Sequence, residues 1–258
     1  MWRLKRKPQH GGNVRHLRNA PITEALIDFR VKARAGFRVE EFESLKELLS
    51  DRFPETGQER DLQVTLKVIR GQPQPPVTQD PGLRGYLFRT SDRKTIVQFR
   101  VDGFTFNRLR PYTRWEDIFP QALELWDLYC SIAKPEVATR LAVRYINRIE
   151  LPTGPVSMEK FLRAAPGIPP ELPQTISSFL TRVTIHDSET AIAAHVAQAL
   201  EAGAAGKPVA VILDIDAFMQ REFAVDDPAI KQTLIQLREF KNRIFFNSLT
   251  EEALRRFE

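Results

Sequence analysis

Strand-like and helix-like apolar patterns follow one another in the same order twice along this chain. Period-two alternation is typical of half-buried strands, and apolar residues spaced three and four apart are typical of amphipathic helices. The first pass opens with an alternating segment at 22–32 and ends with a helical pattern from Trp115 to Ile132. The second opens at 137–151 and ends with a helical pattern that starts at Asp227. Each of these two series of patterns predicts one strand, one helix, three strands and a final helix.

This order predicts an α+β fold made of duplicated β-α-β-β-β-α units, with antiparallel sheets that each wrap a long helix. The expected division is a basic tail at 1–18, a first repeat at 19–134 and a second at 135–258. The segment 189–200 is open to two interpretations. Its alanine content favours a helix, whereas its place in the repeat favours a strand, and we expect the strand.

Local signals refine the first repeat. Alternation at 62–68 predicts a strand that leads into a Pro-rich loop, and a hairpin is expected to turn at Ser91 and Asp92. Gly103 is expected to form a bulge or a bend in the longer second arm of that hairpin. Thr113 and Glu116 have the spacing of a capping box for the helix that follows. A helical pattern at 39–53 ends at a proline.

Cysteine content and hydropathy suggest the compartment. Cys130 is the only cysteine in the 258 residues, so no intramolecular disulfide can form. The N-terminal segment is charged and has no apolar run behind it, which is unlike a signal peptide. No later stretch has the length and apolarity of a membrane span. We therefore expect a cytoplasmic protein without a membrane partner.

Positive charge is concentrated at the N-terminus. The formal net charge is +5, but residues 1–23 hold six basic residues and no acid, so subtracting these six leaves −1 for the rest. A basic arm of this kind can contact phosphates, although it more often only solubilises the chain. The remainder of the chain is electrostatically balanced.

The strongest polar pattern lies in the segment 137–151. Arg140, Arg144 and Arg148 fall on one side of the expected strand, and arginines four apart in a strand are separated by roughly 13 Å. With Arg100 they form the candidate anion-binding or nucleic-acid-binding set.

The alternative is that these arginines pair across the sheet with carboxylates. We expect the strands 22–32 and 138–150 to be neighbours at the centre of the fold, because each opens its repeat and has one apolar side to bury. Glu24 and Asp28 on the first strand would then face the arginines on the second. We prefer this pairing to phosphate binding.

Other chemical groups give weaker signals. Asp214 and Asp216 fall on one side of a strand and are a weak candidate metal pair, for which a salt-bridge role is preferred. His186, His195 and Cys130 have no neighbouring partners that suggest a catalytic set. No common nucleotide-binding, zinc-protease or hydrolase motif occurs, so no cofactor is expected. The aromatic residues from 104 to 115 favour a hydrophobic corner over a base-stacking platform.

Three segments carry a family resemblance: NAPITEALIDFR at 19–30, RYINRIELP at 144–152, and KNRIFFNSLTEEALRRF at 241–257. The chain resembles a sporadically distributed bacterial family of uncharacterised proteins of about this length. The resemblance brings no established activity, cofactor or catalytic residue. The patchy distribution implies a gene that travels with mobile or accessory loci, such as those for phage defence.

These observations favour a non-enzymatic interaction protein, an accessory component of such a locus with a macromolecular partner, most simply a protein. One alternative is nucleic-acid binding through Arg100, Arg140, Arg144 and Arg148 together with the basic tail. The other is a metal-dependent enzyme that uses Asp214 and Asp216.

Overall fold

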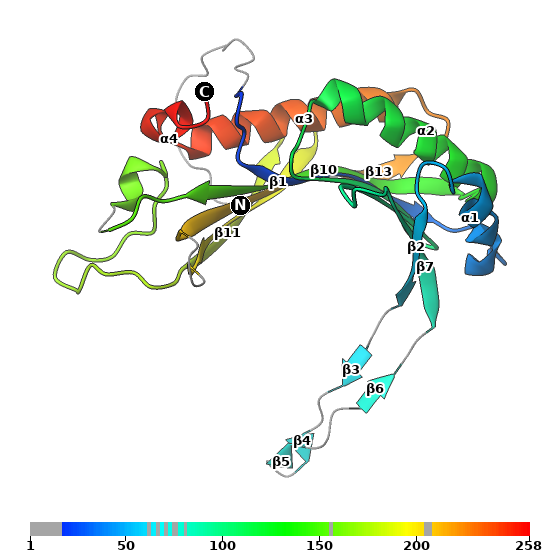
Figure 1. Cartoon of the computed structure of the whole chain (residues 1–258), viewed down its shortest axis with the longest axis horizontal. Helices are drawn as coiled ribbons and strands as arrows, with labels where there is room; N and C mark the ends of the chain where they lie inside the picture. Colours follow the sequence, from blue (N-terminus) through cyan, green and yellow to red (C-terminus); the bar gives the residue numbers. More distant parts are fainter. Residues whose placement is uncertain are drawn as a thin grey trace.

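The computed structural model describes residues 17–60, 63–65, 68–69, 72–73, 77–79, 82–154, 157–203 and 208–258. Most of the predicted basic tail, and parts of the predicted strand at 62–68 and of the Pro-rich loop after it, lie outside these residues. In the described part, one nine-stranded antiparallel sheet carries helices on one face (Figure 1). The predicted α+β class is confirmed. No helix in this part is both long and apolar enough to cross a membrane.

The sheet has the strand order β11-β12-β13-β10-β1-β9-β8-β7-β2. The strands are β1 (Ile22–Lys32), β2 (Glu55–Arg60), β7 (Leu83–Arg89), β8 (Thr95–Arg100), β9 (Gly103–Leu109), β10 (Val137–Glu150), β11 (Leu180–Asp187), β12 (Ile192–Glu201) and β13 (Ala210–Phe223). Beyond β2 and β7, the chain forms two short two-stranded pairs, β3 (Gln63–Thr65) with β6 (Val77–Gln79) and β4 (Val68–Ile69) with β5 (Gln72–Pro73). Figure 1 shows these pairs projecting away from the sheet.

The strands β1 and β10 are antiparallel neighbours at the centre, as predicted. Outward from this pair the order is β1-β9-β8-β7 on one side and β10-β13-β12-β11 on the other. The sheets of the two halves were expected to be joined, and hydrogen bonds between β1 and β10 make them one continuous sheet. The ambiguous segment 189–200 is mostly strand, since β12 runs through it.

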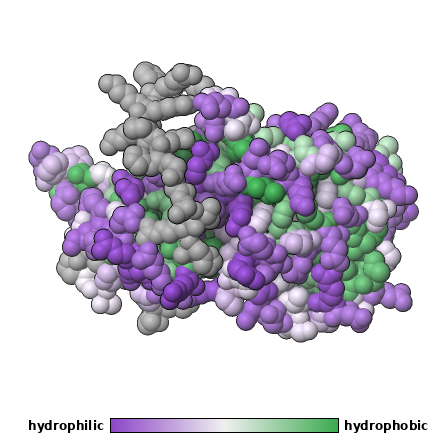
Figure 2. All heavy atoms as spheres, turned by 90° about the horizontal axis from the view of Figure 1, so that it is seen from above, coloured by the Kyte–Doolittle hydropathy of each residue, from purple (hydrophilic) through white to green (hydrophobic). Residues whose placement is uncertain are grey.

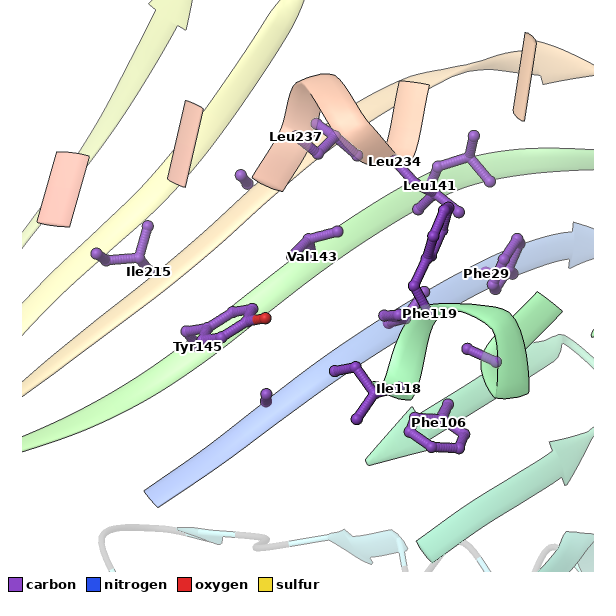
Figure 3. Close-up of a cluster of buried hydrophobic side chains, with 14 of the residues drawn as sticks. Phe29, Phe106, Ile118, Phe119, Leu141, Val143, Tyr145, Ile215, Leu234 and Leu237 are labelled. Carbon is purple, nitrogen blue, oxygen red and sulfur yellow. The ribbon is translucent and has the colours of Figure 1, made fainter. Parts of the chain in front are cut away.

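The long helices α2 (Trp115–Ala133) and α3 (Ala229–Ser248) cover one face of this sheet (Figure 1). The ring of Trp126 stacks on that of Phe29 at 4.2 Å between centroids. Figure 3 shows apolar side chains of β1, β10 and β13, among them Phe29, Val143 and Ile215, together with Leu234 and Leu237 of α3 in one buried cluster. Burial of one apolar side of each central strand is therefore what fixes the two helices on this face.

The segment 39–53 departs from its prediction. Instead of one amphipathic helix it forms a 3₁₀ turn, η1 (Val39–Ser44), followed by a short helix, α1 (Leu45–Leu48). Phe42 and Leu45 are nevertheless fully buried. The apolar spacing thus identified the buried side but not the length of the helix.

Gly103 was expected to be a bulge or a bend within one long hairpin arm, and the chain does turn there, since Gly103 opens β9 directly after a tight turn from β8. A side chain there would place its Cβ 2.1 Å from the carbonyl oxygen of Phe29. The glycine is therefore required by the close approach of β1, and the predicted hairpin arm is two strands. The turn predicted at Ser91 and Asp92 lies between β7 and β8, as expected.

The predicted capping box before α2 is also wrong. The helix begins at Trp115, with Arg114 as its N-cap residue in an extended conformation. Among the described residues, no side chain hydrogen-bonds the amides of that first turn as a cap. A final short helix, α4 (Glu251–Arg255), is capped by Thr250, whose hydroxyl accepts a hydrogen bond from the amide of Ala253.

Candidate binding face of the sheet

The face of the sheet turned away from α2 and α3 is called the open face here (Figure 1). It is where the central strands place their polar side chains. Charged residues that the described strands place on the open face include Glu24, Asp28, Arg30, Arg100, Arg140, Arg144, Arg148, Glu150, Glu201, Asp214 and Asp216. All four candidate arginines thus lie on one face, with the Asp pair beside them.

Asp28 on β1 is the centre of the network. Its carboxylate accepts hydrogen bonds from Thr105 Oγ1 at 2.6 Å, Arg100 Nη2 at 3.2 Å, Arg30 Nε at 3.3 Å and Arg140 Nη1 at 3.4 Å. The side chain is 14% exposed. The hydrogen bonds that this carboxylate accepts compensate for the hydration that it loses on burial.

Arg100 lies at the bottom of the network, with only 4% of its side chain exposed. It donates to Asp28, to Asp102 Oδ1 at 3.4 Å, and to Gln98 Oε1. Burial works to raise the pKa of Asp102, but the hydrogen bond from Arg84 and the charges of the neighbouring arginines hold that pKa below its ordinary value. Arg100 is therefore a buried structural cation rather than a surface ligand.

The arginines of β10 pair mainly with acids on β13. Arg140 donates to Asp216 at 2.7 Å, and Arg144 binds both oxygens of Asp214 at 2.9 and 2.6 Å. The hydrogen bond from Arg144 Nη2 to Asp214 raises the pKa of the Arg144 guanidinium. Both pairs are diagonal in the register: Arg144 lies opposite Asp216 but binds Asp214, which lies opposite Ile146, and Arg140 lies opposite Gln220 but binds Asp216.

Arg148 completes the row near the other end of β10. It contacts Glu201 Oε2 at 2.5 Å, Glu150 Oε1 at 2.6 Å and the carbonyl oxygen of Pro208 at 2.9 Å. The predicted ladder of opposite charges therefore exists, but Asp28 reaches only Arg140 of the β10 row. The predicted partners were wrong for Arg144 and Arg148, because β10 has a second neighbour that the sequence order does not reveal.

Glu24 lies near Arg144 and Asp214. Burial raises its pKa most, the charge of Arg144 lowers it, and the charge of Asp214 raises it again. Phe218 adds an aromatic surface beside this cluster, with the guanidinium carbon of Arg140 4.7 Å from its ring centroid. The open face therefore combines both signs of charge with one aromatic ring.

Asp214 and Asp216 do share one side of β13, as the sequence predicted, but each binds a guanidinium. In the described ranges, no group of three or more His, Cys, Asp or Glu side chains has the arrangement of a metal site. A divalent cation would have to displace Arg140 and Arg144 from these carboxylates. The arrangement favours salt bridges.

The remaining candidates lie apart from this network or at its margin. His186 is exposed, and His195 Nδ1 lies 3.0 Å from Thr184 Oγ1. Burial raises the pKa of the Cys130 thiol to about 12, which disfavours a thiolate. Phe104 and Phe106 are buried under α2, so they form part of a hydrophobic corner rather than a stacking platform.

Neither the comparison with family models nor the comparison with curated proteins finds a match for this chain.

Proposed function

We propose that this protein is a non-enzymatic interaction protein that contacts a protein partner through the open face. The observation that carries the proposal is the row of exposed ion pairs along β10 and β13. Arg144 is 43% and Asp214 is 23% exposed, so their outer edges remain able to meet a partner while their pairing fixes their positions. Preorganised groups of both signs suit a partner with complementary charges.

The family resemblance supports an accessory role. The motif segments at 19–30 and 144–152 include the central strands β1 and β10, and the outward strand order is the same from each. This order supports a duplication of one β-α-β-β-β-α unit, with β2 added to the first copy and the first helix of the second copy reduced to a 3₁₀ turn at Met158–Lys160. We place the gene in a bacterial mobile or defence-type locus beside the gene for its partner.

The test is co-purification from the native host. Arg144→Glu reverses one exposed charge of the open face, and Arg243→Glu reverses a charge on α3 that is 52% exposed. We expect a specific protein to co-purify with the wild type and the Arg243 variant, and at least tenfold less of it with the Arg144 variant. Equal recovery with both variants, or no specific protein with the wild type, would contradict the proposal.

Nucleic-acid binding is the second candidate, and the six basic residues within 1–23 favour it. Against it, the guanidinium groups of Arg100, Arg140, Arg144 and Arg148 are all already bound to carboxylates. Fluorescence anisotropy with labelled 20-base single-stranded and duplex DNA and RNA distinguishes the two. Phosphate contacts would weaken steeply between about 50 and 200 mM salt, and no binding at the lower concentration would eliminate this candidate. The metal-dependent enzyme draws less support, because Asp214 and Asp216 bind arginines.

A further inference from the structure

A cavity of about 300 Å³ lies between the start of β1, the first turn of α2 and the middle of α3. It is on the helix-covered side of the sheet, opposite the open face. Figure 2 views the molecule from that side and shows apolar patches among mostly hydrophilic residues. The side chains that matter here are Tyr112, Tyr145, Asn147, Arg238, Lys241 and Phe245. This volume is at the lower end of the range for small-molecule sites.

Lys241 lines the cavity from α3 and is only 7% exposed. Its Nζ lies 3.6 Å from the centroid of the Tyr145 ring. Among the described residues, no carboxylate forms an ion pair with it. A buried ammonium without a counter-charge destabilises the folded state, and an anion bound beside it would remove this cost.

Other groups around the cavity also attract negative charge. Arg238 lies one turn before Lys241 on α3, and its ion pair with Glu116, at 3.3 Å, uses a carboxylate that is 63% exposed. Arg114, the N-cap residue of α2, makes no side-chain cap bond, although the first turn also carries the acids Glu116 and Asp117. Trp115 and Glu116 of this turn line the cavity. An uncapped helix N-terminus favours anions.

Neutral groups complete the lining. The hydroxyl groups of Tyr112 and Tyr145 are 2.9 Å apart, so one donates to the other. Asn147 is 2% exposed and donates from Nδ2 to the carbonyl oxygen of Leu213. Phe245 contributes an apolar wall. The cavity thus has an anion-attracting end and an apolar body.

We propose that this cavity binds a small organic anion, with one carboxylate or phosphate head beside Lys241 and an apolar body against the aromatic wall. Lys241 supplies the counter-charge, and the α2 amides and Arg238 supplement it. This site is independent of the open face and of any partner bound there.

Binding is expected to take up a proton at pH 8. Burial, and then the charge of Arg238, lower the pKa of Lys241 to about 7, so the empty site holds mainly the neutral amine at pH 8. An anion beside it restores the ammonium. Burial raises the pKa of Tyr112 and of Tyr145, so these hydroxyl groups do not supply this proton change. Arg238 and Glu116, the charged groups that act on both hydroxyls, form an ion pair with each other.

The test is titration calorimetry of the full chain at pH 8 in two buffers of different ionisation enthalpy. The probes are phenyl phosphate, benzoate and inorganic phosphate, and benzyl alcohol is the uncharged aromatic control. We expect saturable binding of phenyl phosphate or benzoate with uptake of about one proton. Lys241→Met should weaken this binding at least tenfold and abolish the proton uptake. Lys231→Met, which changes an exposed lysine of the same helix, should leave both unchanged.

The comparison among the probes identifies the head group and tests the apolar body. Tighter binding of phenyl phosphate than of benzoate assigns a phosphate head, and the reverse assigns a carboxylate. The proposal is overturned if neither binds saturably, if inorganic phosphate binds as tightly as both, or if benzyl alcohol binds as tightly as the anions. Unchanged affinity in the Lys241 variant also overturns it.

A second measurement needs no variant. Acetic anhydride modifies lysines in proportion to their accessible neutral amine, and mass spectrometry of the peptides gives the extent at each site. A saturating concentration of the tighter anion should protect Lys241 at least fivefold and leave Lys231 unprotected. Equal modification of Lys241 with and without the anion would contradict the proposal.

Discussion

Asp28 connects residues that are far apart in the sequence. The donors to its carboxylate come from β1 itself, β8, β9 and β10. Arg100 depends on it most, because that guanidinium has almost no access to water. A single carboxylate therefore ties the charged groups of the two halves together on the open face.

Asp28→Asn keeps the shape of the side chain and removes its charge. We expect the free energy of unfolding to fall by about 3 kcal/mol, since Arg100 loses one of its two carboxylate partners in a buried position. Urea unfolding followed by circular dichroism measures the change. Asp214→Asn is the matched control, because its partner Arg144 is 43% exposed, and it should cost about 1 kcal/mol or less. Similar losses for both variants would contradict the central role of Asp28.

Lys241 makes stability depend on pH. The pKa of this group is about 7 in the folded chain, against an ordinary value of 10.5 for an exposed lysine, so the unfolded chain binds more protons between these values. The contribution of Lys241 therefore makes the free energy of unfolding rise with pH from about 7 to about 10. Below pH 7 the full cost of the buried ammonium is present.

Lys241→Met should accordingly stabilise the protein at pH 6 without ligand, by about 2 kcal/mol. Each pKa unit corresponds to about 1.4 kcal/mol of unfolding free energy. The expected gain is smaller than the pKa shift alone implies, because the variant loses the contact between the ammonium and the Tyr145 ring. The advantage over wild type should shrink towards zero near pH 10. Urea unfolding of both proteins at several pH values measures it. A constant difference across this range would show that Lys241 does not titrate as inferred.

At the scale of elements, the alternating segments were predicted well because each central strand has one apolar side and one polar side. The adjacency of β1 and β10 followed from this pattern. The partner of Arg144 could not be predicted, since the fold places β13 beside β10 although the two strands are far apart in the sequence. The same holds for Arg148 and Glu201, which lies on β12, the next strand beyond β13. At Gly103 the sequence predicted a bulge or a bend, and the chain turns there, but the close approach of Phe29 that requires glycine could not be predicted.

The cavity was missed, although α3 carries a signal for it. Lys241 stands four residues after Leu237 and three before Ile244, which are both buried, so a charge occupies the apolar stripe of the helix. Such a position indicates a buried cation. The residues that complete the cavity come from β1, β10 and the start of α2, and only the fold brings them together.

Gly103→Ala tests the closeness of β1 and β9. The added Cβ would meet the backbone carbonyl of Phe29, and neither strand can move without breaking the central pairing. We expect a loss of about 3 kcal/mol, at the upper end of overpacking effects. Thermal unfolding followed by circular dichroism measures it. Gly167→Ala is the control, because a Cβ at that position would have no neighbouring heavy atom within 4 Å, and it should change stability by less than about 0.5 kcal/mol. Equal stability of the two variants would refute the required contact.

At the scale of the whole molecule, the two halves of the chain share one sheet and one layer of buried side chains. The boundary expected between 134 and 135 therefore separates neighbouring central strands rather than independent domains. A half made alone would expose one long edge of β1 or β10.

The full chain should consequently unfold in one transition. Circular dichroism and tryptophan fluorescence are expected to give coincident urea curves, because the tryptophans at 115 and 126 lie in the first half while the strand signal comes from both. The polypeptides 19–134 and 135–258, expressed separately, should be aggregated or unstructured. Two separated transitions, or a well-folded half, would show that the repeats are independent.

The central pairing of β1 and β10 also sets how quickly backbone amides can meet solvent deuterium. Both strands are hydrogen-bonded on both edges, so their amides open only when the sheet does. The strand β11 is the opposite case: it lies at the edge, and Leu180, Val183 and Ile185 are exposed. Hydrogen exchange followed by mass spectrometry should therefore show labelling that spreads inward from β11, with β1 and β10 the last peptides to gain mass. The region that stays free of deuterium longest would be the join between the two halves.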